Sequence, residues 1–211
     1  MKNELIKRIL SSIILIPISL FFIIKGSFLF IFFISICFVI IAYEWHMMRK
    51  KKSFYFFGFL FLIFSFVTIY ELRFSFNLDY IWLLIVTIIC VATDIGGYIF
   101  GKLFKGPKLT QLSPNKTYAG MIGGYFLSLI SLSYSFQYFE LEFTINWLFF
   151  TLLVSSVSQL GDIIISYFKR LSKIKDTGKI IPGHGGLLDR VDGMIFAFPF
   201  AYIIILIGVF S

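Results

Sequence analysis

The sequence predicts an all-α integral membrane protein with about seven transmembrane helices and a cytoplasmic N-terminus. Hydrophobic residues make up 59% of the 211 residues and charged residues only 14%, which leaves too few polar side chains to cover a soluble domain of this size. The apolar residues come in runs of roughly 16 to 22, which suit helices that cross a hydrocarbon core about 30 Å thick and are too long for ordinary strands. Basic residues gather in every second loop between these runs.

The predicted spans form one membrane domain over residues 1–211. The first is the weakest, because it is about 24 Å long at 1.5 Å per residue and contains Pro17. A re-entrant segment therefore stays open as an alternative there. No cleavage site follows it, so we expect a retained span and not a signal peptide. In chain order the spans are Ile9–Ile24, Phe28–Met47, Phe54–Tyr70, Tyr80–Gly101, Tyr118–Phe136, Trp147–Phe168 and Gly193–Phe210.

The orientation follows from the basic residues. Seven spans with a cytoplasmic N-terminus place 17 of the 19 Lys and Arg residues inside, and only Lys25 and Arg73 outside. The formal net charge of +8 is then explained by loops that face an anionic leaflet, and no nucleic-acid partner is expected. Residues 102–117 and 169–191 form the longest, most basic and most Gly-rich loops, and both lie inside. We therefore expect the functional site to face the cytoplasm.

A polar stripe follows one face of the sixth span. Its members are spaced by 4, 3, 4 and 3 residues, which puts them on one side of a helix. Contact between helices through small polar residues is the alternative explanation. An acid within a span is costly to bury, so Asp162 favours a functional site, and Lys169 would give it a nearby cation or share an anionic ligand with it. The stripe consists of Ser155, Gln159, Asp162, Ser166 and Lys169.

A glycine-rich loop precedes the last span. Gly185 and Gly186 let the backbone approach a ligand closely, and successive amides there can bind an anion. Asp189 and Asp192 are three residues apart at the start of the following helix, so they share a face. Carboxylates beside such a loop are the hard oxygen ligands that Mg²⁺ with a nucleotide requires. A charged loop with a capping Asp is the alternative.

Three further polar positions lie near the cytoplasmic ends of other spans. Asp94 is the only acid of the fourth span, and the glycines that follow it permit close helix packing. Lys116 stands at the entry of the fifth span, where it could bind phosphate or extend to the interface. His46 lies beside Glu44 at the end of the second span, where an interfacial role is expected ahead of substrate contact.

These residues resemble the signature of the phosphatidate cytidylyltransferases, also called CDP-diglyceride synthetases. That signature runs S-x-x-K-R, K-D, P-G-H-G-G and D-R-x-D, and a dozen identities match over some 27 residues. The resemblance covers about residues 93–192, while 1–92 match only in hydrophobicity and 193–211 form the last helix. The matching residues are Ser166, Lys169, Arg170, Lys175, Asp176, Pro182 to Gly186, Asp189, Arg190 and Asp192, with Asp94 and Asp162 in two further motifs.

The resemblance implies that CTP and phosphatidate react to give CDP-diacylglycerol and pyrophosphate in a bacterial inner membrane. It implies a metal centre of Mg²⁺, with room for a second monovalent or divalent cation, at Asp162, Asp189 and Asp192. Ser166 and Lys169 would complete the catalytic group. A homodimer stays open. The residues implied to bind substrate are Asp94, Lys116, Arg170, His184, Gly185, Gly186 and Arg190.

Two departures from the family pattern fall in the loop before the fifth span. Asn115 and Ala119 stand where the family usually has Lys and Glu, and the role of this loop is correspondingly open. Two other functions remain alternatives. One is a CTP-dependent enzyme that acts on another lipid phosphate or a lipid alcohol. The other is an ion or phosphate transporter, which the plain outer loops disfavour.

Overall fold

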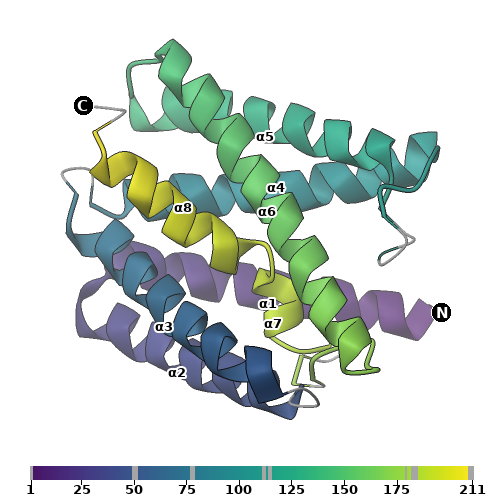
Figure 1. Cartoon of the computed structure of the whole chain (residues 1–211). Coiled ribbons are helices and arrows are strands. Elements are labelled where there is room, and N and C mark those ends of the chain that lie inside the picture. Colours follow the sequence, from purple (N-terminus) through teal and green to yellow (C-terminus); the bar gives the residue numbers. More distant parts are fainter. Residues whose placement is uncertain are drawn as a thin grey trace.

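The chain folds as a bundle of helices (Figure 1). This computed structural model describes residues 2–48, 52–76, 79–110, 113, 116–178, 180–181 and 185–208, with side chains from residue 14 on except at 52–54. Over these ranges no strand is present, and two isolated bridges pair Lys108 with Thr117 and Ile181 with Gly185. The all-α class is therefore confirmed. The helices are α1 (Lys2–Lys25), α2 (Ser27–Met47), α3 (Lys52–Phe74), α4 (Ile81–Phe104), α5 (Tyr118–Phe139), α6 (Ile145–Leu171), α7 (Leu188–Val191) and α8 (Met194–Leu206).

Five of the seven predicted spans are long and apolar enough to cross a membrane. Within the described residues these are α2, α4, α5, α6 and the Tyr55–Phe74 part of α3. The apolar part of α1 that meets the described range, Ile14–Lys25, is shorter. Helix α8 has 13 residues, which is about 20 Å at 1.5 Å per residue. The end of the last predicted span, at residues 209–210, lies outside the described residues.

The last predicted helix is divided in two. Asp189 lies in the first turn of the short α7, and the chain turns at Asp192 and Gly193 before α8 begins. Gly193 permits this turn to lie directly on α6, because a Cβ there would stand 2.7 Å from the carbonyl oxygen of Ser158. The acids of the D-R-x-D motif therefore belong to α7 and the turn after it, beside the middle of α6.

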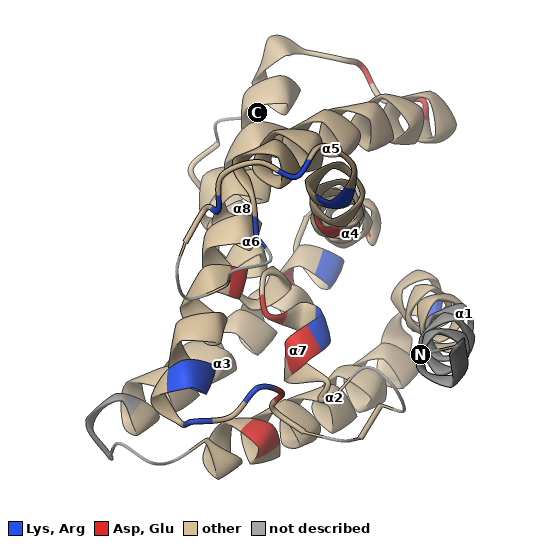
Figure 2. Ribbon diagram, turned by 90° about the vertical axis from the view of Figure 1, so that its right-hand side faces the viewer, with Lys and Arg blue, Asp and Glu red and all other residues tan. Residues whose placement is uncertain are grey.

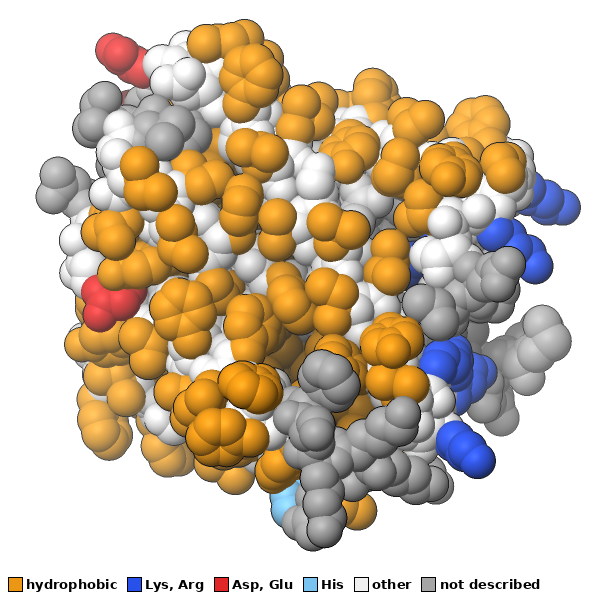
Figure 3. All heavy atoms as spheres, in the orientation of Figure 1, with side chains coloured by type: hydrophobic (Ala, Val, Ile, Leu, Met, Phe, Trp, Pro, Cys, Tyr) orange, Lys and Arg blue, Asp and Glu red, His pale blue; other side chains and the backbone are white. Residues whose placement is uncertain are grey.

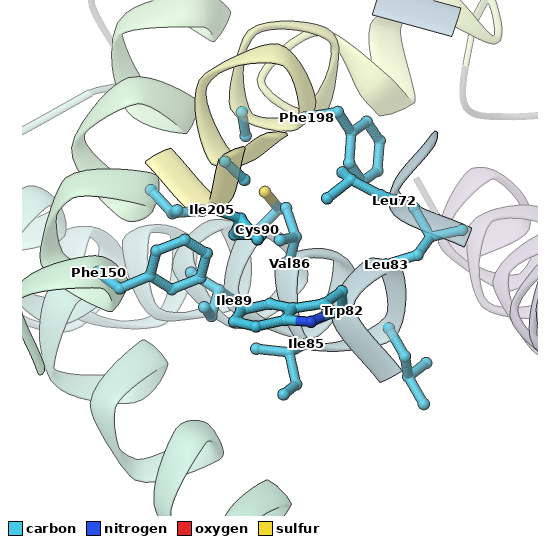
Figure 4. Packing of buried hydrophobic residues seen from close by; sticks show 14 of the residues in the cluster. Leu72, Trp82, Leu83, Ile85, Val86, Ile89, Cys90, Phe150, Phe198 and Ile205 are labelled. Carbon is cyan, nitrogen blue, oxygen red and sulfur yellow. The ribbon is translucent and has the colours of Figure 1, made fainter. Parts of the chain in front are cut away.

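Among the described residues, helix α4 supplies the largest share of the central core. Its buried residues include Trp82 and Ile89, and Figure 4 shows them beside Phe150 of α6. In a bilayer the hydrophobic effect does not drive helices together, so this close packing must stabilise the bundle through van der Waals contact. A rigid α4 is the result, and it carries Asp94 toward the site.

Glycines let α4 and α5 touch backbone to backbone. A Cβ at Gly96 would stand 2.9 Å from the carbonyl carbon of Gly123, and one at Gly120 would stand 2.7 Å from the carbonyl oxygen of Gly97. The expected role of Gly96 and Gly97 in helix packing is thus confirmed. The contact has a consequence for the site, because it brings the loop before α5, with Lys116, beside the end of α4.

The outer surface is apolar across the middle and charged at two edges. Figure 3 shows a broad hydrophobic face, with basic side chains at one edge and acidic side chains at the opposite edge. Large side chains on this surface are strongly exposed, among them Phe28 at 76% and Tyr138 at 82%. Such a surface is stable only where lipid replaces water, so the chain is an integral membrane protein.

Candidate active site

Acidic and basic positions gather where α4, α6 and α7 approach one another (Figure 2). The polar stripe of α6 faces this region and not lipid. Ser155 is fully buried and accepts a hydrogen bond of 2.8 Å from Thr93 of α4. One turn beyond the middle of the stripe, the Ser166 hydroxyl stands 3.4 Å from Oδ1 of Asp162. The expected common face is confirmed, and its C-terminal half carries the charges.

Asp162 pairs with Lys116 and not with Lys169. The distance from Lys116 Nζ to Asp162 Oδ2 is 2.5 Å, and the two side chains are 23% and 28% exposed. The expectation that Lys169 supplies the cation beside Asp162 is therefore wrong. The physical reason is the close contact of α4 with α5, which carries the start of α5 to α6 from another part of the chain. Lys116 is thereby placed in the site, and not at a lipid interface.

Lys169 instead joins α6 to α7. Its Nζ lies 2.8 Å from Oδ1 of Asp189 and 3.9 Å from Oδ2 of Asp192. The three side chains are between 5% and 11% exposed. The buried ammonium lies between two carboxylates and offsets part of their negative charge.

The carboxylate of Asp189 also organises the loop before α7. Its Oδ2 accepts hydrogen bonds from the backbone N–H groups of Thr177 and Gly186, at 2.7 and 3.0 Å, and from the Thr177 hydroxyl at 3.1 Å. Burial raises the pKa of Asp189, but the bonds from Lys169 and from these two amides lower it further, and the net pKa lies below its ordinary value. Asp189 is thus ionised, and it is the anion that the Gly186 amide binds in this structure.

Two residues of this arrangement, Glu44 and Thr177, were missed in the sequence. Glu44 of α2 is 1% exposed and accepts hydrogen bonds from the amides of Leu187 and Leu188 and from the Thr177 hydroxyl. The expectation of an interfacial role for Glu44 is wrong, although His46 does lie at the exposed end of α2, 2.6 Å from the Tyr55 hydroxyl. The signal was available, because Glu44 is an acid inside an apolar span, as are Asp94 and Asp162.

Asp94 and Asp192 complete the acidic group. Each lies close enough to Asp162 and to Lys116 for electrostatic interaction, and Asp94 also interacts electrostatically with Arg190. Asp94 is exposed on α4, whereas Asp192 is 8% exposed. An exposed acid inside a long apolar helix requires water or a polar ligand beside it. The predicted residues from α4, α5, α6 and α7 therefore do meet at one place.

Three predicted residues take no part in the ion pairs described above, although Gly185 lies against Asp189, where a Cβ would stand 2.9 Å from Oδ2. Arg170 is exposed, and its Nη1 donates to the carbonyl oxygen of Ile174 at the end of α6. Gly185 has a φ of +89°, which suits glycine, and it pairs with Ile181 through the backbone. His184 lies outside the described residues. The proposed phosphate contacts of all three stay predictions.

The oxygen ligands near α6 suit a hard divalent cation only in part. Asp162 and Ser166 offer a carboxylate and a hydroxyl on one face, with Asp192 nearby. Both oxygens of Asp189 are engaged by donors, so this residue would have to exchange donors to bind a metal. Among the described residues no group of three or more His, Cys, Asp or Glu side chains is arranged to hold an ion. Asp162 is engaged in the same way, by Lys116 and Ser166, so either acid would have to exchange a donor for a metal ion.

Comparison with known proteins places this site in a family. The sequence profile of the cytidylyltransferase family matches residues 54–208, which include all of α4 to α8. The chain is 39% identical to a phosphatidate cytidylyltransferase of Staphylococcus aureus over 184 residues, covering 82% of this chain and 68% of that protein. It is 36% identical to that of Staphylococcus saprophyticus over 183 residues, with the same shares covered. It is 45% identical to that of Staphylococcus haemolyticus over 118 residues, covering 54% of this chain and 45% of that protein.

The match spans the helices that deliver every described residue of the charged cluster except Glu44. Its extent and the identity to full enzymes over most of the chain leave one assignment: this chain belongs to the cytidylyltransferase family.

Proposed function

We propose that this protein is a phosphatidate cytidylyltransferase that transfers the cytidylyl group of CTP to phosphatidate, giving CDP-diacylglycerol and pyrophosphate. The observation that carries the proposal is the meeting of two buried or half-buried ion pairs, Lys116 with Asp162 and Lys169 with Asp189, in the region that the family profile matches. Paired ammonium and carboxylate groups of this kind suit a reaction between two phosphate-bearing substrates.

The chemistry needs no protein nucleophile. An oxygen of the lipid phosphate, which is already ionised, attacks the α-phosphorus of CTP. A new P–O bond forms there while the bond from the α-phosphorus to the bridging oxygen of the β-phosphate breaks, and pyrophosphate leaves with the electron pair. The main obstacle is repulsion between two anions, so catalysis can come from alignment and from charge neutralisation.

Each group of the site has a role in that scheme. Lys116 and Arg190 hold phosphate oxygens of the two substrates, and Lys169 keeps Asp189 and Asp192 from repelling them. Asp162 with Ser166 would hold Mg²⁺, together with Asp192. When bound, the ion neutralises charge that builds up on the transferring phosphoryl group and on pyrophosphate. Asp94, exposed inside α4, faces the polar end of a substrate.

The protein is proposed to span the membrane seven times with a cytoplasmic N-terminus, as expected in a bacterial inner membrane. Helices α1 and α8 would be the two shorter spans, and the charged cluster would face the cytoplasm, where CTP is found. The separation of basic from acidic side chains at opposite edges of the molecule supports this orientation. The cluster itself stands at the ends of α4 and α6 that carry Lys102 and Lys169.

The proposal is tested with purified protein, CTP, Mg²⁺ and phosphatidate in mixed micelles. CDP-diacylglycerol and pyrophosphate should appear in equal amounts, and neither should form when phosphatidate is replaced by diacylglycerol. Product formation from diacylglycerol but not from phosphatidate would identify a CTP-dependent lipid kinase and overturn the proposal.

A further inference from the structure

Glu44 occupies an unusual position for an acid. It lies in α2, a helix that is otherwise apolar, and its side chain is enclosed with 1% exposure. All of its described hydrogen-bond partners belong to one distant stretch of chain. Oε1 accepts from the Leu187 amide at 2.9 Å, and Oε2 accepts from the Leu188 amide at 2.8 Å and from the Thr177 hydroxyl at 2.9 Å. No positive side chain is among these partners.

The two hydrogen bonds from backbone N–H groups make Glu44 the N-terminal cap of α7. The residue before α7 is Leu187, which has no side-chain oxygen to accept from the free amides of the first turn. Glu44 supplies that acceptor from another helix, and its charge suits the positive end of the α7 backbone. The direction in which α7 leaves the loop is therefore set by α2.

The third bond continues into the charged cluster. The Thr177 hydroxyl has one hydrogen, which two acceptors share, Oε2 of Glu44 at 2.9 Å and Oδ2 of Asp189 at 3.1 Å. Lys169 donates to the other oxygen of Asp189 at 2.8 Å. A continuous path of polar contacts thus runs from α2 through the loop and α7 to α6. Glu44 does not itself contact Lys169, but it is linked to the position of the Asp189 side chain through Thr177.

The loop is built closely around this carboxylate. Gly178 packs on it, since a Cβ there would stand 2.7 Å from Oε1 of Glu44, and Gly186 leaves no more room on the other side. Helix α2 is itself held in place at this end. The Ser172 hydroxyl after α6 donates to the Met48 carbonyl oxygen at 2.7 Å, and the Trp45 and Phe168 rings meet with centroids 5.3 Å apart. Movement of Glu44 is therefore small.

We infer that Glu44, acting through Thr177, is a positioning residue for the reaction, which orients α7 so that Asp189 and Lys169 meet at the site. The inference rests on the proposed function. Glu44 precedes the region matched by the family profile, which begins at residue 54, and so adds a contribution from the N-terminal helices to the site.

The test compares turnover with substrate affinity in folded, purified enzyme. Glu44→Gln keeps the size of the side chain but puts an NH₂ group against one of the α7 amides, so that a donor faces a donor. A displacement of the Asp189–Lys169 pair by about 1 Å should lower kcat about 10- to 100-fold. The KM for CTP should change less than about threefold, because Glu44 does not touch the nucleotide.

A matched pair at Thr177 tests the path itself. Thr177→Val removes the hydroxyl and should lower kcat by a similar factor, while Thr177→Ser retains it and should keep kcat within about threefold of the wild type. The double variant Glu44→Gln/Thr177→Val should be no slower than the worse single variant, because both changes break the same path. Multiplying losses in the double variant would overturn the inference.

Controls separate positioning from general stability. Ser65 is buried and its described hydrogen bond goes to the Ile195 carbonyl oxygen and not to Glu44, Thr177 or Asp189, so Ser65→Ala should lower the melting temperature and leave kcat per folded molecule unchanged. If Glu44→Gln behaves like Ser65→Ala, or acts only through KM, the inference is wrong. If Glu44→Gln does not fold, the Thr177 pair decides. Wild-type enzyme that makes no CDP-lipid would refute the proposed function instead.

Discussion

Replacing Lys169 with Met should destabilise the protein and stop the reaction for different reasons. The ammonium stands between Asp189 and Asp192, and the three side chains are nearly enclosed. Met has a similar length and fills the same space, but it leaves two carboxylates without a cation. The thermal unfolding comparison is made without Mg²⁺, so that no metal can take the place of the ammonium, and turnover is measured with Mg²⁺.

The expected decrease in the free energy of unfolding follows from the contacts of Lys169. Removing one partner of a buried ion pair costs about 3–5 kcal/mol. Asp189 keeps three hydrogen bonds to its other oxygen, from Thr177 and Gly186, so the lower figure of about 3 kcal/mol is expected. For a chain of this length, 1 kcal/mol shifts Tm by about 2–4 °C. The midpoint of thermal unfolding in detergent should therefore fall by about 6–12 °C.

A double variant separates stability from chemistry. In Lys169→Met/Asp189→Asn one unpaired charge is gone, so about half of the lost Tm should return, while turnover stays below detection. Lys108 is exposed, and Lys108→Met serves as the control, with Tm and turnover close to the wild type. The reasoning fails if Lys169→Met melts like the wild type, or if the double variant loses the sum of the two single losses.

Three further outcomes are expected. Asp162→Asn should lower turnover by roughly a thousandfold in folded protein, because a metal ligand is lost. Asp176→Asn, at an exposed position, should change turnover little. If Asp162→Asn kept the turnover of the wild type at low Mg²⁺, Asp162 would be excluded as a metal ligand. CTP should be used well ahead of ATP and GTP in competition assays, and equal turnover with ATP would contradict the proposed function. In a cysteine-free background, a cysteine at Glu142 should react with an impermeant reagent added outside sealed cells and one at Lys108 should not; the opposite pattern would invert the proposed topology.

The sequence predicts most of the fold because membrane helices are specified locally. Within the described residues, every predicted span after the first begins and ends within about four residues of a helix, since run length and apolar composition alone decide whether backbone groups are satisfied in lipid. The break between α7 and α8, just before the last predicted span, was not foreseen. It depends on the contact of Gly193 with Ser158, two residues far apart in the chain.

In the candidate site, too, features set by spacing within one helix could be predicted, and contacts between helices could not. Helical spacing is sufficient to place Asp162, Ser166 and Lys169 on one face. Which acid each lysine meets depends on how helices pack, so the pairing of Asp162 with Lys116 and the capping of α7 by Glu44 could not be read from spacing. The presence of an acid inside an apolar span was a sufficient signal that Glu44 has hydrogen-bond partners. The neighbouring sequence does not indicate which residues those partners are.

The most direct test of the account follows the phosphorus atoms of CTP. Purified protein is incubated with phosphatidate, Mg²⁺ and CTP labelled either at the α- or at the γ-phosphorus, and the lipid is extracted. Cytidylyl transfer predicts that the α-label enters the lipid fraction and that the γ-label remains in water as pyrophosphate. Label from the γ-position in the lipid, or no α-label there, would contradict the central claim.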